Sequence, residues 1–126
     1  MTGYIVFAHG SSVESANEAV RVVAREMARR GNFEHVVAAF LEGGKPDLDS
    51  AAQSLTGIAG VDRIVVIPYF LTLGLHLQRD LPRLIDSVRA RLRGVEIEVT
   101  APLDGHPAMV DALLDRAREL PVCKQS

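Results

Sequence analysis

Short apolar runs alternate along the chain with longer amphipathic segments, and there are four of each kind. The apolar runs cover residues 4–8, 35–41, 63–70 and 95–100, lengths that suit strands. The segments after them repeat apolar residues every three or four positions, the spacing of a helix with one buried face. The pattern therefore predicts a strand followed by a helix, repeated four times.

Cap and turn residues predict where the helices begin and end. Ser15 with Glu18 fits a capping box at the start of the first helix, and Gly31 fits its end. Pro46 fits the first turn of the second helix, and Pro82 fits the first turn of the third. Apolar residues of the last helix are expected to face the core, at positions Val110, Leu113, Leu114 and Ala117.

Strict alternation of strands and helices predicts an α/β fold, a three-layer sandwich around a four-stranded parallel sheet. The run 63–70 is continuously apolar, which favours a strand covered on both faces, whereas 95–100 alternates with charge, which favours an edge. We expect the strand order 2-1-3-4, in which the first and third strands lie side by side where the order reverses. Residues 1–120 form a single domain, and 121–126 are expected to be a disordered tail.

Composition narrows the class of protein. A chain of 126 residues is enough for one domain, and a net charge of −2 gives no general attraction to nucleic acid or acidic membranes. We see neither an apolar run that spans a bilayer nor a secretory leader. A single cysteine, Cys123, excludes an intrachain disulfide. These features predict a cytoplasmic globular protein with neither nucleic acid nor membrane as a partner.

Two histidines follow the strands that meet at the reversal point. His9 comes directly after the first strand, and His76 follows the third through a short loop. The carboxyl ends of neighbouring parallel strands lie at one edge of the sheet, so both imidazoles are expected to open onto one crevice. Imidazole binds Fe, Co, Ni and Zn, and two histidines leave most of the coordination shell open. This suits a metal ion that is passed on.

Residues beside these histidines are candidates for supporting roles. Gly10 would let the backbone approach a ligand, and Ser11 or Ser12 would either orient the His9 ring or cap the next helix. Glu42 ends the second strand at the same edge, as a proton acceptor, a third ligand or a solvated carboxylate. The sequence leaves these alternatives open.

The other two histidines are interpreted as structural. His106 precedes Pro107 at the start of the last helix, where a cap is favoured over a functional role. His35 begins the second strand and so lies at the opposite edge of the sheet.

Several common functions lack their motifs. The chain has no G-x-G-x-x-G, no P-loop, no G-x-S-x-G and no acidic cluster after the first strand. Histidine phosphatases also place His-Gly after the first strand, but they normally have arginine where this chain has Ala8. A pure interaction module would leave the polar groups at one edge unexplained. Histidine and carboxylate chemistry remains.

Four groups of residues stand together in the order of a known family. They are His9-Gly10-Ser11, then Phe40-Leu41-Glu42 with Pro46, then Val65-Val66-Ile67-Pro68 leading to His76-Leu77-Gln78-Arg79-Asp80-Leu81-Pro82, and Pro102-Leu103-Asp104-Gly105-His106-Pro107. With this set, which covers nearly the whole domain, the chain resembles the small sirohydrochlorin chelatases. These are the cobaltochelatase and ferrochelatase enzymes, chelatase-like proteins of class II, in cobalamin and sirohaem biosynthesis.

The resemblance implies a lyase that inserts Co²⁺ or Fe²⁺, with Ni²⁺ as a further candidate, into the tetrapyrrole sirohydrochlorin. It implies no ATP and no organic cofactor, because the divalent metal is itself a substrate, and it implies a homodimer. His9 and His76 would be metal ligands and, with Glu42, the catalytic residues. Substrate binding is expected at Gly10, Ser11, Ser12, Leu73, Gly74, Leu75 and Arg79. The alternative is a non-enzymatic protein that binds or delivers a divalent metal through the same histidines.

Overall fold

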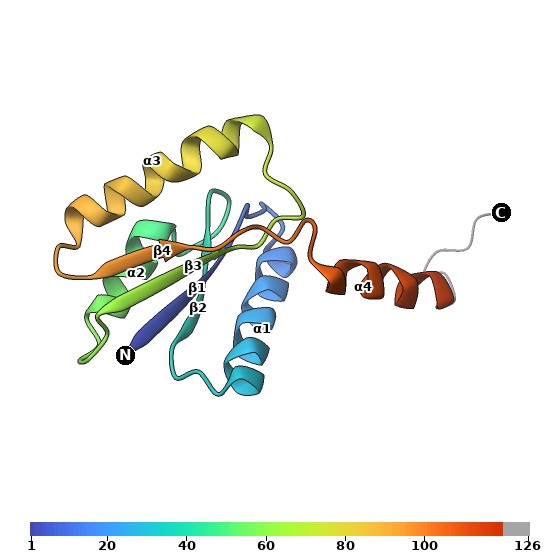
Figure 1. Cartoon of the computed structure of the whole chain (residues 1–126), viewed down its shortest axis with the longest axis horizontal. Coiled ribbons are helices and arrows are strands. Elements are labelled where there is room, and N and C mark those ends of the chain that lie inside the picture. The colour runs from blue at the N-terminus through green and yellow to red at the C-terminus, as the bar shows by residue number, and fades with distance from the viewer. Residues whose placement is uncertain (120–126) are drawn as a thin grey trace.

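The computed structural model, which describes residues 1–119, alternates strands and helices along the chain (Figure 1). The elements, in order, are β1 (Thr2–Ala8), α1 (Glu14–Gly31), β2 (Val36–Phe40), α2 (Leu48–Thr56), β3 (Arg63–Pro68), α3 (Leu75–Arg91), β4 (Glu96–Val99) and α4 (Pro107–Arg118). The predicted tail, 121–126, lies outside the described residues.

The four strands form one parallel sheet in the order β2-β1-β3-β4, which confirms the predicted fold class and strand order. Tyr4 of β1 lies opposite Val36 of β2 on one side and opposite Val65 of β3 on the other. Strand β4 stands at the end of the order, as its alternating pattern predicts. The carboxyl ends of β1 and β3 are therefore neighbours.

Helices cover the two faces of the sheet unequally. Figure 1 shows α3 on one side of the sheet and α1 on the other. Helices α2 and α3 bury the larger cluster, against Ile5 and Phe7 of β1 and Ile64 of β3. Helix α1 buries a smaller one against Val6 and Phe40. Burial of these apolar surfaces is the main stabilising contribution to such a domain.

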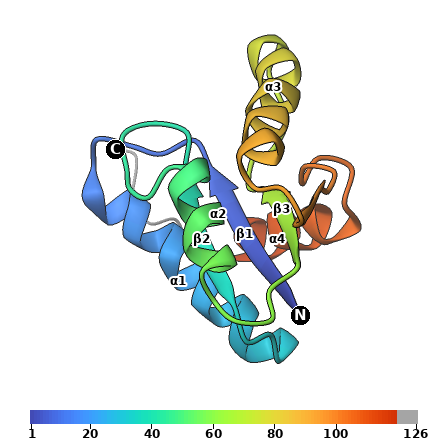
Figure 2. The ribbon, with the colours of Figure 1, turned by 90° about the vertical axis from the view of Figure 1, so that its left-hand side faces the viewer.

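Helix α4 does not pack as expected. Figure 1 shows it extending away from the sheet, in the direction that points away from the viewer in Figure 2, and none of its residues, all of which are described, is buried. The prediction that its apolar residues face the core is therefore wrong for this chain. Strand β3 consequently differs too, because only alternate residues are buried, and Val65 and Ile67 on the uncovered face are half-buried.

Of the two predictions about the ends of α1, the first is wrong and the second is confirmed. Its N-cap is Val13 without a side-chain bond, so Ser15 lies inside the helix and forms no capping box. Helix α1 ends at Gly31 as predicted, and Asn32 after it takes the left-handed conformation with φ of 54°. A Cβ on Gly31 would lie 2.4 Å from the Phe33 ring, so a larger residue there would have to displace this side chain.

The helix starts predicted from Pro46 and Pro82 are both wrong. Helix α2 begins after Pro46, at Leu48, because the Asp47 carboxylate caps it by accepting a bond from the Ser50 N–H at 2.8 Å. Helix α3 begins at Leu75 and runs through Pro82. Proline removes one intrahelical hydrogen bond, and burial of other residues of α3 offsets that loss. These residues are Leu81, Ile85 and Val88.

Candidate active site

The first part of the candidate site lies where β1 and β2 end. Their parallel pairing continues past both strands, since the Leu41 N–H donates to the Ala8 carbonyl at 2.9 Å and the Glu42 N–H donates to the His9 carbonyl at 3.0 Å. This places Glu42 beside His9, with 3.6 Å between Glu42 Oε1 and His9 Nε2. Both side chains are exposed, so they are free to meet a ligand.

Gly10 permits the close approach of these two loops. It has a φ of +90°, and a Cβ at this position would lie 1.7 Å from the Glu42 carbonyl oxygen. Only glycine fits such a backbone contact. The backbone that lies close to Gly10 is thus the loop that carries Glu42. A contact between Gly10 and a ligand stays a prediction.

Asn17, which the sequence analysis did not identify, joins the same two loops from inside α1. Its side chain is 1% exposed. The Asn17 amide oxygen accepts from the Ser11 N–H at 2.9 Å, and its nitrogen donates to the carbonyls of Ser11 at 2.8 Å and Gly43 at 3.1 Å. The loops that carry His9 and Glu42 are therefore held by one buried amide.

The two predicted serines lie on the α1 side of His9. The Ser11 hydroxyl accepts from the Val13 N–H at 3.0 Å, so it stabilises the turn that enters α1. Ser12 is exposed. A role for either serine in substrate binding stays a prediction.

His76 belongs to the first turn of α3 and not to the loop before it. Its Nδ1 lies 3.1 Å from Nη2 of Arg79, three residues later on the same helix. Arginine can only donate, so His76 Nδ1 accepts, and the neutral ring then carries its proton on Nε2. Arg79 is thus bonded to a predicted metal ligand in this structure.

His9 has the opposite arrangement. Its Nδ1 lies 3.2 Å from the Gly10 carbonyl, which can only accept, so this bond places the ring proton on Nδ1. The Nε2 lone pair of His9 is then free and points toward the Glu42 carboxylate. A free imidazole lone pair is what a divalent metal requires.

One pocket of about 340 Å³ brings the two histidines together. Its lining comes from the loops after β1, β2 and β3 and from α3: His9, Leu41, Phe70, Thr72, Gly74, Leu75, His76, Leu77 and Asp80. Gly74 and Leu75, both predicted for substrate binding, are among them. Leu73 lies elsewhere, since it lines a pocket between α3 and β4. The expectation that both imidazoles open onto one crevice agrees with this geometry.

Asp80 is a second residue that the sequence analysis did not assign. It lines the same pocket as His76 and follows it by four residues, one turn of α3. A helix that starts near Pro82, as the sequence predicts, does not include His76 and Asp80, whereas α3 begins at Leu75 and includes both. Within residues 1–119, no group of three or more His, Cys, Asp or Glu residues is arranged to hold a metal ion.

Large apolar side chains are exposed at and near this pocket. Leu75, which lines it, is 82% exposed, and Leu71, in the loop between β3 and α3, is 66% exposed. Exposed apolar groups around a polar centre are typical of a surface that binds a partner or a ligand. The pocket therefore combines the imidazoles of His9 and His76 with exposed apolar side chains.

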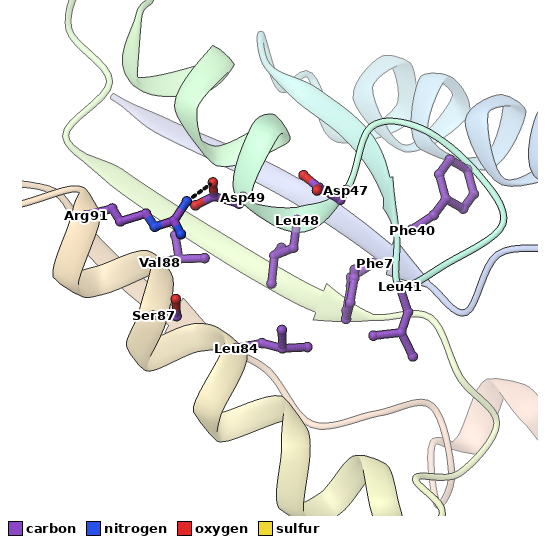
Figure 3. Close-up of a pocket in the computed structure, with 10 residues that line it drawn as sticks. All are labelled: Phe7, Phe40, Leu41, Asp47, Leu48, Asp49, Leu84, Ser87, Val88 and Arg91. Atoms are coloured by element: carbon purple, nitrogen blue, oxygen red, sulfur yellow. Dashed lines mark hydrogen bonds and ion pairs between the residues drawn. The ribbon is translucent and has the colours of Figure 1, made fainter.

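A separate pocket of about 280 Å³ lies between α2 and α3 (Figure 3). Arg91 and Asp49 at its edge form an ion pair with 2.7 Å between Nη1 and Oδ2. Asp47 caps α2, and the Ser50 N–H lowers the pKa of this carboxyl below its ordinary value. These polar groups already bond within the protein, so this pocket has less capacity for chemistry than the pocket of the two histidines.

The remaining histidines have the places expected for structural residues. His106 caps α4, with its Nδ1 accepting from the Ala108 N–H at 3.0 Å. The backbone of His35 accepts from the Tyr4 N–H at the opposite edge of the sheet. Within residues 1–119, no helix is both long and apolar enough to cross a membrane.

Residues 3–120 match the family described as CbiX. Over 125 residues the chain is 33% identical to the sirohydrochlorin cobaltochelatase of Saccharolobus solfataricus, covering 94% of this chain and 95% of that protein. This chain covers a smaller share of the length of two other relatives. The sirohydrochlorin cobaltochelatase of Methanopyrus kandleri is 33% identical over 68% of this chain and 59% of that protein. The chloroplastic sirohydrochlorin ferrochelatase of Arabidopsis thaliana is 30% identical over 90% of this chain and 50% of that protein.

A solved structure is also similar to this chain in sequence and in fold. The crystal structure of a cobalamin biosynthesis CbiX protein from Marinobacter aquaeolei superposes with a TM-score of 0.82 and 30% sequence identity. The match covers 94% of this chain and 95% of that one.

Proposed function

This chain belongs to the CbiX family, and from that membership we propose that it is a chelatase that inserts Co²⁺ or Fe²⁺ into sirohydrochlorin. Its relatives are named as enzymes of this reaction, so a delivery protein without turnover is not favoured. The observation that carries the proposal is the single pocket lined by His9 and His76.

Metal insertion exchanges the two N–H protons of the macrocycle for one divalent cation. The site must therefore hold the cation briefly and accept protons. His9 offers its free Nε2 as a ligand, while the Glu42 carboxylate, 3.6 Å away, is placed to accept a proton or to balance the charge of the cation. A small donor set from one chain favours transfer of the metal over retention.

Arg79 connects substrate binding to the second ligand. While its guanidinium donates to His76 Nδ1, that nitrogen is not available to a metal. A carboxylate on the rim of the macrocycle is a stronger partner for arginine than a neutral imidazole. Binding of the macrocycle thus draws Arg79 away and frees His76 for metal or proton.

The macrocycle itself would lie on the apolar mouth of the pocket, against Leu71 and Leu75. Gly74 leaves open space beside it, because a Cβ there would meet nothing within 4 Å. We further propose that Gly10, Ser11, Ser12 and Leu73 contribute to the same binding surface.

Several finer features belong to this proposal. The protein would act as a homodimer in the cytoplasm, without an organic cofactor, nucleic acid or membrane as partner. Ni²⁺ would also be accepted, since imidazole binds it well. A net charge of −2 and the single Cys123 support this setting.

The test is anaerobic metal insertion into sirohydrochlorin, followed by its absorbance, with each of the three metals. We expect turnover above the spontaneous rate that is lost in His9→Ala and His76→Ala. The matched control is His106→Asn, which changes an exposed histidine but keeps a helix cap and should retain activity. A folded protein that binds metal without accelerating insertion would point to the delivery function instead.

A further inference from the structure

The pocket of the two histidines contains a carboxylate that the proposed function does not use. Asp80 lines this pocket, and its side chain is 52% exposed, so an ion from solution can reach it. It follows His76 by four residues on α3, and side chains at this spacing are neighbours on the same side of a helix. Zinc-binding helices of the H-E-x-x-H type have their two ligands at the same spacing. His76 and Asp80 are therefore positioned to share one cation.

The Arg79 guanidinium contacts both of these groups. Its Nη2 donates to His76 Nδ1 at 3.1 Å, and its Nε lies 3.8 Å from Asp80 Oδ1. A guanidinium is a cation that can only donate hydrogen bonds, so it binds where other groups offer lone pairs. A metal cation requires the same lone pairs. Arg79 thus occupies a position where the protein offers an imidazole nitrogen and a carboxylate oxygen to a positive charge.

The other half of the pocket has the same composition. There, His9 Nε2 lies 3.6 Å from Glu42 Oε1, again an imidazole beside a carboxylate. A carboxylate balances part of the charge of a dication, which lowers the cost of bringing the ion into a pocket with a largely apolar lining. Because residues 1–119 contain no group of three or more such ligands, water completes the coordination shell at each pair and binding is weak. Two weak sites in one pocket suit stepwise transfer of an ion.

We propose that His76 and Asp80 form a loading site for the divalent metal, which the Arg79 guanidinium occupies until the macrocycle binds. From this loading site the ion passes to His9 and Glu42. The proposal rests on the chelatase function proposed above and identifies Asp80 as the residue that receives the metal with His76. A carboxylate of the macrocycle draws Arg79 away, so the loading site opens when the acceptor is present. Each step exchanges ligands on the ion and leaves its oxidation state unchanged.

Binding of Co²⁺ alone, under anaerobic conditions and without a tetrapyrrole, tests the loading site. The parent protein is His9→Ala, because this change removes the other imidazole of the pocket. The double variant His9→Ala, His76→Ala gives the background binding of the rest of the chain, which includes His35 and His106. Calorimetric titration of the parent with Co²⁺ should show binding above this background.

Changes at Arg79 and Asp80 should act in opposite directions. Arg79→Gln, added to the parent, removes the competing cation and should raise the affinity for Co²⁺. Asp80→Asn, added to that double variant, should lower the affinity at least about tenfold, since even a residue that only supports a metal ligand is typically worth about 10–100-fold. The matched control is Asp86→Asn, the same substitution at an exposed residue of α3 that pairs with Arg89, which should leave the affinity unchanged.

The order of these variants distinguishes a metal ligand from a residue that only positions Arg79. If Asp80 acted through Arg79 alone, its effect on Co²⁺ affinity would disappear once Arg79 is replaced, and that result would overturn the assignment. Both side chains are more than half exposed, so the variants should remain folded by circular dichroism. In the otherwise wild-type protein, Asp80→Asn should raise the KM for metal and leave the KM for sirohydrochlorin unchanged, a separation that a merely structural role does not produce.

Metal insertion by the wild-type protein decides the chelatase function separately. Insertion above the spontaneous rate, together with equal Co²⁺ affinities with and without the Asp80 carboxylate, would overturn the loading site and leave the function in place. A loss of Co²⁺ affinity in Asp80→Asn, from a wild type that does not accelerate insertion, would support the cation site of His76 and Asp80 and overturn the chelatase function.

Discussion

Asn17→Ala removes the buried amide that joins the loops of His9 and Glu42. The Ser11 N–H and the carbonyls of Ser11 and Gly43 lose their partner in a part-buried region. A buried polar group left without a partner costs about 1–3 kcal/mol. Alanine recovers about 0.5 kcal/mol as a better helix former. The cost of the unsatisfied polar groups exceeds the gain in helix propensity, and we expect a net loss of about 2–3 kcal/mol in the free energy of unfolding.

Urea unfolding followed by circular dichroism measures this loss. The matched control is Gln53→Ala, which removes an exposed amide on α2 that bonds only Asp49 and should change stability by less than about 0.5 kcal/mol. Asn17→Asp sharpens the test, because a carboxylate can accept from Ser11 but cannot donate to the two carbonyls. It should be at least as destabilising as alanine.

The same variants should affect catalysis at a temperature where all remain folded. Looser loops let the separation between His9 and Glu42 vary, so kcat should fall more than the KM for sirohydrochlorin rises. An Asn17→Ala protein that loses less than about 1 kcal/mol, the worth of one ordinary hydrogen bond, would refute the reasoning.

Three further predictions follow from single contacts. Gly10→Ala should cost at least about 3 kcal/mol in urea unfolding, because its Cβ would overlap the Glu42 carbonyl, and a smaller loss would show that the loops can separate freely. Asp47→Ala should lower the free energy of unfolding by about 1 kcal/mol at neutral pH. Because the Ser50 N–H lowers the pKa of Asp47, this difference from wild type should have its full size above the ordinary aspartate pKa. It should vanish as the pH falls through the lowered pKa of folded Asp47. Arg79→Gln should lower the KM for metal and raise the KM for sirohydrochlorin, because His76 is released while a partner for the substrate carboxylate is lost; two unchanged KM values would contradict the role of Arg79.

Strand order and the meeting of His9 and His76 could be predicted because both follow from chain topology. Parallel strands with right-handed crossovers leave few arrangements, and residues that end neighbouring strands must share an edge. The position of Asp80 could not be predicted, because it depends on where α3 begins. Proline favours a first turn, but the burial of Leu81 and Ile85 carries the helix through Pro82.

Asn17 did leave a signal in the sequence, although a weak one. It stands on the same side of the helix as Val20, Ala24 and Met27, which pack in the α1 cluster, and it is the polar residue of that stripe. A polar side chain on a buried stripe must find partners in the protein. What the stripe cannot tell is which partners, because Ser11 and Gly43 come from two loops whose approach depends on Gly10.

The packing of helix α4 could not be predicted from the sequence, although the helix itself could. Its stripe of Val110, Leu113 and Leu114 correctly indicates a helix whose apolar face needs cover, but periodicity does not specify whether the cover comes from the same molecule. That choice depends on the hydrogen bonds of Thr100 and Leu103, which direct the chain past the sheet. The stripe therefore predicts the helix correctly, whereas its packing against the sheet of the same chain depends on a chain path that periodicity does not encode.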